Sequence, residues 1–162
     1  MCSSDLPPPR AAAGKVFVGI QNLELGNARG YAAAFDAETG KELWRFHTVP
    51  GDPAKPYENP QMEMAAKTWG PDYWKTAAGG GAGGVWDGMV YDPETDLLLF
   101  GTGNPAPHGA SPFFEWLGTH ELLFSDSIIA VSASTGKYAW HFQLVDRKST
   151  RLNSSHLVIS YA

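Results

Sequence analysis

The stretch Ala34–Trp44 (AFDAETGKELW) returns later in the chain as Ala130–Trp140 (AVSASTGKYAW). The shared pattern A-x-D/S-A-x-T-G-K-x-x-W describes a strand, a tight turn and a returning strand. Thr-Gly suits the turn because glycine adopts positive φ without a steric penalty. The closing tryptophan falls on the returning strand, where we expect it to pack on a neighbouring unit of the same kind.

A third, degenerate copy lies between these two at Tyr91–Asp96 (YDPETD), followed by the apolar run Leu97–Phe100. Units that recur every 40–50 residues or so are typical of β-propeller blades, each built from about four strands. The 18 glycines, 12 prolines and 6 tryptophans also suit short strands joined by many turns. The sequence therefore predicts an all-β fold, a partial β-propeller of about two four-stranded antiparallel blades with long loops.

Further strands are expected from short runs rich in apolar, β-branched and aromatic residues. They are Lys15–Gly19, Tyr31–Phe35, Val85–Tyr91, Leu97–Gly101, Ser127–Val131 and Tyr138–Gln143. Two long segments, Thr48–Gly84 and Pro105–Thr119, interrupt the strands. The first contains one helical candidate, Asn59–Lys67. Excursions of this length inside a compact domain are usually functional or disordered.

Charge and composition exclude several classes of protein. The 162 residues carry a net charge of −5, and phosphate binding needs a concentration of basic side chains, so nucleic acid is not the expected main partner. No uncharged apolar run approaches the roughly 18 residues that a membrane span requires. Met1–Arg10 lacks the apolar core of a secretory signal. Cys2 is the single cysteine, so no intrachain disulfide is possible.

Both ends of the chain differ in character from the rest. Residues 146–162 (DRKSTRLNSSHLVISYA) replace glycine and aromatics by Ser, Arg and Asn, and they resemble the translation of a short-read sequencing adapter. Cys2–Leu6 (CSSDL) resembles the opposite adapter end. We therefore expect an adapter-like part at 1–6, a propeller fragment at 7–145 and a disordered, adapter-like part at 146–162. The alternative is a natural polar tail with a short terminal strand.

Three segments, Gly19–Phe46, Gly79–Asn104 and Ser127–Gln143, carry a more specific pattern. They contain, in order, the motifs ARGY, DAETG, VWD, YDP, GTGNP and WHFQ. Each motif alone is weak, but their order and spacing resemble the middle of the PQQ-dependent (quinoprotein) alcohol dehydrogenases. The resemblance covers nearly all of 7–145.

This resemblance implies an enzyme that oxidises a primary or secondary alcohol by hydride transfer to PQQ. A cation, Ca²⁺ or a lanthanide, would polarise the quinone carbonyl as a Lewis acid. It implies that Glu24 and Asn104 bind the metal, since hard cations prefer carboxylate and amide oxygens. Trp86 falls at the position that stacks on the PQQ ring. Gly84 stands where the family usually has Thr, so one polar contact to the cofactor is lost.

Each of these residues also has a simpler interpretation. Glu24 lies in the turn-like QNLELGN, where an isolated Glu is usually solvated. Asn104 precedes Pro105 and follows Gly-Thr-Gly, which is typical of a turn, and Trp86 could belong to the core. The run Gly79–Gly84 is not followed by GK and Ser or Thr and opens no G-x-G-x-x-G helix, so a phosphate-binding loop is rejected.

Other positions depart from the family pattern or lack a role. The segment Glu24–Gly30 is one residue longer than usual, with Asn27 as the extra residue, and Asn22 and Leu23 replace the small residues that normally precede the Glu. His108 stands where an aromatic residue is common. His108 and His120 lack the spacing of a metal site, so both are expected on the surface.

The resemblance also places the catalytic Asp a few residues after the WHFQ motif, beyond Val145. We therefore expect no catalytic residue within 7–145, and a piece that is inactive alone. Because two blades leave exposed sheet edges, it should also be insoluble or molten. The parent enzyme would act in the periplasm on a small alcohol, with cytochrome c or a quinone as electron acceptor.

Two other functions remain open. A non-catalytic PQQ-like propeller, such as an outer-membrane assembly scaffold, shares the tryptophan turns but has no reason to bring Glu24, Trp86 and Asn104 together. A sugar- or glucan-binding β-domain is suggested only by the aromatic content. Metal-binding oxygens of Glu24 and Asn104 beside Trp86 would favour the enzyme, whereas side chains on separate faces would favour the scaffold.

Overall fold

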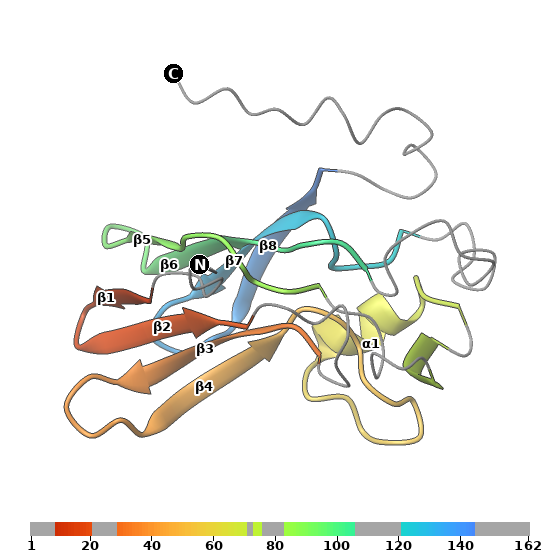
Figure 1. The fold of residues 1–162 in the computed structure, drawn as a ribbon, viewed down its shortest axis with the longest axis horizontal. Helices are drawn as coiled ribbons and strands as arrows, with labels where there is room; N and C mark the ends of the chain where they lie inside the picture. Colours follow the sequence, from red (N-terminus) through yellow and green to blue (C-terminus); the bar gives the residue numbers. More distant parts are fainter. Residues whose placement is uncertain (1–8, 21–28, 71–72, 76–82, 106–120, 145–162) are drawn as a thin grey trace, which may run out of the picture.

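Two four-stranded antiparallel sheets make up the body of the molecule and lie against each other (Figure 1). The computed structural model describes residues 9–20, 29–70, 73–75, 83–105 and 121–144. Strand orders are β1-β2-β3-β4 and β5-β6-β7-β8, so consecutive strands are always neighbours. The strands are β1 (Arg10–Ala12), β2 (Lys15–Gly19), β3 (Tyr31–Asp36), β4 (Glu42–His47), β5 (Val90–Asp92), β6 (Leu97–Gly101), β7 (Ser127–Ser132) and β8 (Tyr138–Gln143).

The predicted all-β fold with two four-stranded antiparallel blades is confirmed. Strand β1 was not predicted, because its three residues carry too short a pattern. The strand predicted at Val85–Tyr91 is wrong over most of its length, since only Val90–Asp92 is a strand. The preceding residues instead make backbone contacts with the chain after β6, as described below. Glu24, His108, His120 and both adapter-like ends lie outside the described residues.

The repeated sequence forms the same hairpin turn in both sheets. In the first copy the Asp36 carboxylate accepts hydrogen bonds from the backbone N–H and the hydroxyl of Thr39, both at 2.7 Å. Ser132 replaces this aspartate in the second copy, and its Oγ accepts a hydrogen bond from the backbone N–H of Thr135 at 3.2 Å. Gly40 and Gly136 both have φ of 69°, the left-handed conformation that glycine adopts without a Cβ penalty.

The degenerate copy is also a turn, but it occupies a different place in its blade. It joins β5 to β6, whereas the two full copies join the last two strands of each sheet. The Asp92 carboxylate accepts from the Thr95 hydroxyl at 2.5 Å. Asp96 stands at the glycine position with φ of 55°. The third copy is therefore a hairpin within the second blade.

The tryptophan that closes the first repeat joins the two blades. Trp44 Nε1 donates a hydrogen bond of 3.0 Å to the carbonyl oxygen of Ala133. Its ring covers Gly136, where an added Cβ would lie 2.6 Å from Trp44 Cδ2. The expected packing of this residue on a neighbouring unit is thus confirmed. The equivalent Trp140 is 41% exposed, and a Cβ at Gly40 would meet nothing within 4 Å of the described structure.

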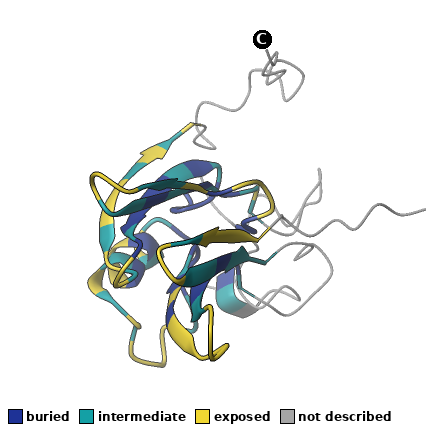
Figure 2. Cartoon of the chain, turned by 90° about the vertical axis from the view of Figure 1, so that its left-hand side faces the viewer, coloured by how far each residue is buried: buried dark blue, intermediate teal, exposed yellow. Residues whose placement is uncertain are grey.

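An apolar core fills the space between the sheets, and exposed positions gather at the turns and along β8 (Figure 2). Phe46 contacts Phe100, Phe124 and Tyr138, with ring centroids 6.5, 6.4 and 6.5 Å away. On β3 the run Ala32–Ala34 is fully buried, and such small side chains let neighbouring layers approach closely. Burying a large apolar side chain such as that of Phe46 stabilises the fold by roughly 1.5–3 kcal/mol.

The long segment after β4 is anchored to the second blade. It contains helix α1 (Pro60–Ala66) and the 3₁₀ helix η1 (Tyr73–Lys75). The predicted helix Asn59–Lys67 is confirmed, with Asn59 as N-cap and Lys67 as C-cap. None of the helices in the described ranges is long and apolar enough to cross a membrane.

Hydrogen bonds connect this segment to the residues before β7. Trp69 Nε1 donates to the carbonyl of Leu123 at 2.6 Å, and the N–H of Phe124 donates to the carbonyl of Thr48 at 2.9 Å. The N–H of Leu122 donates to the carbonyl of Thr68 at 3.2 Å. The segment is thus a tethered part of the fold.

Candidate functional site

The candidate site is built where residues 83–86 run beside residues 102–104. The N–H of Gly83 donates to the carbonyl of Asn104 at 3.2 Å, and the N–H of Gly103 donates to the carbonyl of Gly84 at 2.8 Å. These two bonds bring together three of the four residues predicted for the site, Gly84, Trp86 and Asn104. The two strands β5 and β6 lie between them in the sequence.

Trp86 presents a large aromatic surface to solvent. Its side chain is 56% exposed, so the alternative that it belongs to the core is wrong. One side of the indole rests on the backbone at Gly103, where an added Cβ would lie 2.8 Å from Nε1 and 3.0 Å from Cδ1. An exposed indole supported by backbone offers a flat surface on which a conjugated ring can stack.

Asn104 contributes a side-chain amide to the candidate site, whereas Gly84 contributes only its backbone. Asn104 is exposed, one residue after the glycine that supports the indole. Gly84 is buried, and its carbonyl accepts the Gly103 N–H. With no side chain, Gly84 supplies only backbone, so the hydroxyl that the resemblance leads one to expect there is missing.

Glu24, the other predicted metal ligand, lies outside the described residues, but the chain before it touches the site. Gly19 ends β2, and a Cβ added there would overlap the Val85 carbonyl oxygen and lie 2.7 Å from Val85 Cβ. On the other side, Ile20 N–H donates to the Tyr31 carbonyl at 3.2 Å. Within the described residues no three His, Cys, Asp or Glu side chains group together as metal ligands.

Two buried threonines hold the backbone of the site in place. The hydroxyl of Thr48 donates to the carbonyl of Gly83 at 2.6 Å. The hydroxyl of Thr102 donates to the carbonyl of Phe124 at 2.6 Å and accepts from the N–H of Ser127 at 3.0 Å. Because each bond is shielded from water, losing it would leave a buried polar group without a partner.

Arg29 fixes the chain directly after residues 21–28. Its Nε and Nη2 donate to the Val49 carbonyl at 3.0 and 2.7 Å, and its guanidinium pairs with the Glu58 carboxylate. Burial raises the pKa of Glu58, but the hydrogen bonds and charge of Arg29 outweigh this, so that pKa is lowered overall. The chain on either side of the Glu24 segment is therefore tied down at both Ile20 and Arg29.

His47 lies beside this ion pair at the end of β4. Burial, reinforced by the positive charge of Arg29, lowers the pKa of His47 to about 4. The imidazole is therefore neutral at pH 7. Its Nδ1 is buried and has no hydrogen-bond partner within the described part of the chain.

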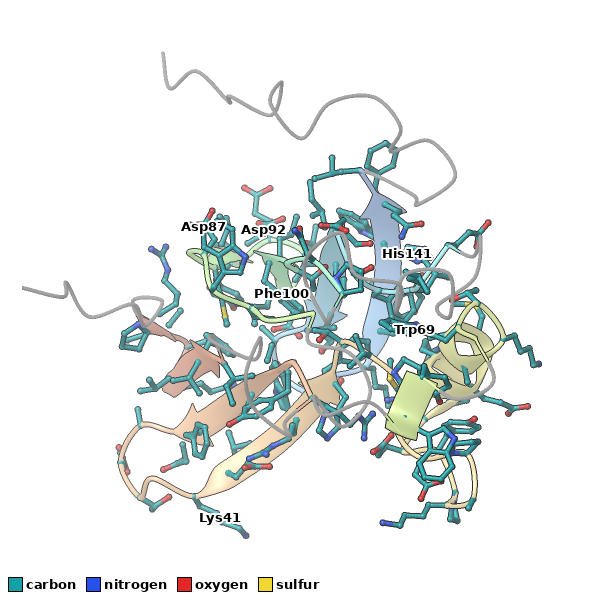
Figure 3. All side chains as sticks on the ribbon, turned by 45° about the vertical axis from the view of Figure 1, so that its right-hand side comes forward. Lys41, Trp69, Asp87, Asp92, Phe100 and His141 are labelled. Carbon is teal, nitrogen blue, oxygen red and sulfur yellow. The ribbon has the colours of Figure 1, made fainter. Side chains whose placement is uncertain are left out.

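Asp87 and His141, which belong to the VWD and WHFQ motifs, lie apart from each other. Asp87, next to Trp86 in sequence, is exposed, and Figure 3 shows it well apart from Trp69 and His141 in that view. His141 belongs to the β8 motif WHFQ, and its Nδ1 lies 2.8 Å from the Tyr138 hydroxyl. Burial lowers the pKa of His141 as well.

Sequence reasoning missed the supporting residues of the site. Gly19 and Gly103 carry no side chain, and Thr48, Thr102 and Arg29 act through contacts distant in sequence. One pattern could have identified the glycines. Glycine at the end of an otherwise apolar strand often marks the close approach of another backbone.

This arrangement matches a known family. Residues 4–149 match the family model described as PQQ, the glucose/ethanol/alcohol dehydrogenase β-propeller domain. The chain belongs to this PQQ dehydrogenase family. The match covers most of the sequence, and with it the resemblance seen in the motifs is confirmed.

Relatives within the PQQ dehydrogenase family are close in sequence. The lupanine 17-hydroxylase (cytochrome c) of a Pseudomonas species is 48% identical over 153 residues, which is 94% of this chain and 21% of the relative. The quinohemoprotein alcohol dehydrogenase ADH IIB of Pseudomonas putida is 51% identical over 140 residues, 84% of this chain and 19% of the relative. The chain thus spans about a fifth of the length of these relatives.

Solved structures of the family share the fold. The quinohemoprotein alcohol dehydrogenase from Comamonas testosteroni superposes with a TM-score of 0.77 at 42% identity, over 86% of this chain and 20% of that one. A europium-containing methanol dehydrogenase superposes with a TM-score of 0.67 at 25% identity, over 87% of this chain and 24% of that one. Both matches support a segment of a larger propeller.

Proposed function

We propose that the chain is part of a PQQ-dependent alcohol dehydrogenase, in which Trp86 stacks on PQQ and Glu24 and Asn104 bind the metal. The observation that carries this proposal is the exposed Trp86 indole, held on Gly103 one residue before Asn104. Supported by backbone on one side and open to solvent on the other, the indole can stack on a planar ligand. Membership of the PQQ family supports a planar quinone as this ligand.

The residues present fit the cofactor and its cation. Trp86 offers a flat apolar face, and Asn104 offers an amide oxygen, a ligand type that Ca²⁺ and lanthanides accept. Glu24 would add a carboxylate from the segment that follows Gly19. When bound, PQQ with its cation accepts a hydride from a primary or secondary alcohol.

The chain's own contribution to this reaction is to hold fixed surfaces. The Thr48 hydroxyl fixes the Gly83 carbonyl, and the Gly103 N–H fixes the Gly84 carbonyl, so the indole rests on rigid backbone. Preorganised contacts of this kind avoid reordering when the cofactor binds. No residue of the described site is assigned as the catalytic base, which we place after the WHFQ motif of the parent enzyme.

The parent enzyme would pass electrons from the cofactor to a cytochrome c or a quinone. The names of relatives point to both acceptors, since they include a cytochrome c hydroxylase, quinohemoproteins and an alcohol dehydrogenase (quinone) of Gluconobacter oxydans. Family resemblance further favours a small alcohol substrate and a periplasmic location. Alone, the chain should be inactive, because it spans only about a fifth of its relatives.

The alternative of a non-catalytic PQQ-like scaffold is weaker. A scaffold has no use for a solvent-facing indole beside an exposed amide, whereas Trp86 and Asn104 come from segments joined by two backbone hydrogen bonds. A sugar-binding domain gains no support from the relatives named above. The enzyme is therefore the function that these side chains fit best.

A chimeric enzyme tests this proposal. In the chimera, residues 9–144 replace the aligned segment of the Comamonas testosteroni quinohemoprotein alcohol dehydrogenase, to which the chain is 44% identical over 136 residues. We expect the chimera to bind PQQ with Ca²⁺ and to oxidise a primary alcohol. Trp86→Ala should weaken PQQ binding, and Asn104→Ala should raise the Ca²⁺ concentration needed for it.

The matched control is Trp74→Ala, which removes a partly buried indole packed on the cluster around Trp69 and Tyr73, remote from Asn104 in sequence. Trp74→Ala should leave PQQ affinity within about twofold, less than 0.5 kcal/mol. A folded chimera that binds no PQQ, or in which Trp86→Ala has no more effect than Trp74→Ala, would reject the proposed function.

A further inference from the structure

The segment that carries Trp86 is held between two glycines from different blades. Gly19 ends β2 in the first sheet, and Gly103 follows β6 in the second. Each meets the segment where no Cβ would fit. One glycine therefore faces Val85 and the other faces Trp86.

The contact at Gly19 is with backbone. An added Cβ would overlap the Val85 carbonyl oxygen and would stand 2.7 Å from both Cβ and Cγ1 of Val85. Val85 is fully buried, so its side chain has no free space into which to move. A side chain at Gly19 therefore forces the backbone before Trp86 to shift.

The contact at Gly103 is with the indole itself. An added Cβ would stand 2.8 Å from Nε1 and 3.0 Å from Cδ1 of Trp86, and 3.5 Å from the Gly84 carbonyl oxygen. Trp86 is 56% exposed, so its ring has room to move away. A methyl group at Gly103 should thus lift the ring and leave the surrounding backbone in place.

Two nearby glycines are free of such contacts and serve as controls. A Cβ at Gly101, two residues before Gly103, or at Gly88, two residues after Trp86, meets nothing within 4 Å. Neither has positive φ. Alanine at these positions adds the same methyl group near the site without touching it.

We propose that Gly19 and Gly103 are positioning residues that set the height of the Trp86 ring relative to Asn104. Gly103 immediately precedes Asn104, and Gly19 leads into the segment with Glu24. Gly103 thereby ties the stacking surface to Asn104, and Gly19 ties it to the end of β2. The inference rests on the proposed function for its consequence, but its geometry concerns only residues of this chain.

The test uses four alanine variants of the chimera, at Gly19, Gly103, Gly88 and Gly101. We expect Gly103→Ala to weaken PQQ binding about tenfold or more, which corresponds to about 1.4 kcal/mol. Gly101→Ala and Gly88→Ala should change it by less than about twofold, or roughly 0.4 kcal/mol. Gly19→Ala should weaken PQQ binding and also lower the thermal unfolding midpoint, because it moves backbone.

A second measurement follows the indole without any cofactor. With 5-fluorotryptophan incorporated, the Trp86 resonance is assigned by its loss in Trp86→Phe. Gly103→Ala should shift this ¹⁹F resonance in the apo chimera, whereas Gly101→Ala should not. An unshifted resonance in Gly103→Ala overturns the inference, whatever the PQQ affinity.

A double-mutant cycle separates positioning from a purely structural effect. In the Trp86→Ala background Gly103→Ala should have almost no further effect on PQQ affinity, since the methyl group then meets no ring. An equal loss in both backgrounds would overturn the inference. If the wild-type chimera binds no PQQ but the ¹⁹F shift occurs, the proposed function fails and the positioning geometry stands.

Discussion

The indole of Trp44 on β4 donates its N–H to the carbonyl oxygen of Ala133, 89 residues further along the chain. The same ring lies over Gly136, in the turn that repeats the turn before Trp44 itself. The tryptophan of one repeat therefore packs on the Thr-Gly turn of the next, and both copies possess such a tryptophan and such a turn. This contact joins the two blades at their turns, beside the shared apolar core.

Replacing Trp44 should weaken the joint between the blades. Trp44→Phe keeps an aromatic ring but leaves the buried Ala133 carbonyl without its donor, so we expect a loss of about 1–3 kcal/mol in the free energy of unfolding. Urea denaturation of the chimera, followed by circular dichroism, measures this. Leu43→Ala is the control because Leu43 is 45% exposed, and it should cost less than about 0.5 kcal/mol. Equal losses in the two variants would argue against the role of the hydrogen bond.

Two glycines with nearly the same φ separate backbone strain from packing. Gly14 has φ of 71° and Gly136 has φ of 69°, so alanine at either position is strained by about 1–2 kcal/mol. Only Gly136 also faces Trp44, since a Cβ at Gly14 meets nothing within 4 Å. Gly136→Ala should therefore destabilise the chimera more than Gly14→Ala, and Trp44→Ala should remove the excess. The urea midpoints of Gly14→Ala, Gly136→Ala, Trp44→Ala and the double variant Trp44→Ala/Gly136→Ala provide the comparison.

The Thr48 hydroxyl should matter for the site as well as for stability. Thr48→Val preserves shape but leaves the Gly83 carbonyl without its buried donor, at an expected cost of about 1–3 kcal/mol. Amide hydrogen exchange at residues 83–86 should become faster, and PQQ affinity should fall. Thr48→Ser retains the hydroxyl and should restore most of both. Unchanged exchange in Thr48→Val would show that other contacts suffice to hold the segment.

Stability should fall between pH 6.5 and pH 4 because of His47. Its pKa is lowered to about 4 in the fold and is near 6.5 when unfolded, so the unfolded state binds more protons in this window. The contribution is fully present above pH 6.5 and is lost as the pH falls through the window. Urea midpoints measured from pH 7 to pH 4.5 should decline less steeply in His47→Gln than in the parent chimera.

The pKa of His141 is lowered too. The contribution of His47 is therefore isolated by the difference in pH dependence between His47→Gln and the parent chimera, rather than by the pH dependence of the parent alone. The lowered carboxylate pKa values of Glu58 and Asp36 act mainly below about pH 4.5. An identical pH slope in His47→Gln and in the parent would contradict the assignment.

The 162-residue chain on its own should lack a rigid tertiary structure. Strand β8 exposes Trp140, Phe142 and, just beyond it, Leu144, with exposed fractions of 41%, 63% and 51%. Open sheet edges beside such apolar surface favour aggregation. We expect strong binding of a hydrophobic dye and little near-ultraviolet circular dichroism. Cooperative thermal unfolding of a soluble monomer would contradict this expectation.

Local repetition made the fold predictable. The pattern shared by Ala34–Trp44 and Ala130–Trp140 predicted a turn, a pair of strands and a docking tryptophan. The turn and the strand pair are present in both copies, and Trp44 of the first copy docks on the second. The strand expected at Val85–Tyr91 failed for a physical reason. Gly84 accepts a hydrogen bond from Gly103, and Trp86 turns to solvent, so these residues follow another backbone rather than a sheet ladder.

The site was predictable in its residue types but not in its support. A tryptophan and an asparagine could be proposed from motifs, while their proximity depends on strands β5 and β6 folding between them. Gly19 and Gly103 act by the absence of a side chain, which leaves no chemical signature in a sequence. Thr48 and Arg29 act through partners more than fifteen residues away.

Trp44 and Gly136 form the contact between the two blades. The equivalent residues of the other copy, the exposed Trp140 and the open turn at Gly40, are the two halves of a further contact of the same kind. The two halves of the contact, a tryptophan and a turn, differ and lie on separate blades. The contact is therefore heterologous, and it can be repeated between successive blades without limit. The row of blades closes into a ring only when the rotation between neighbouring blades brings the tryptophan of the last blade to the turn of the first. Closure of the ring is thus a property of geometry summed over all blades. Two blades therefore carry the contact surfaces of a ring that only further units can close.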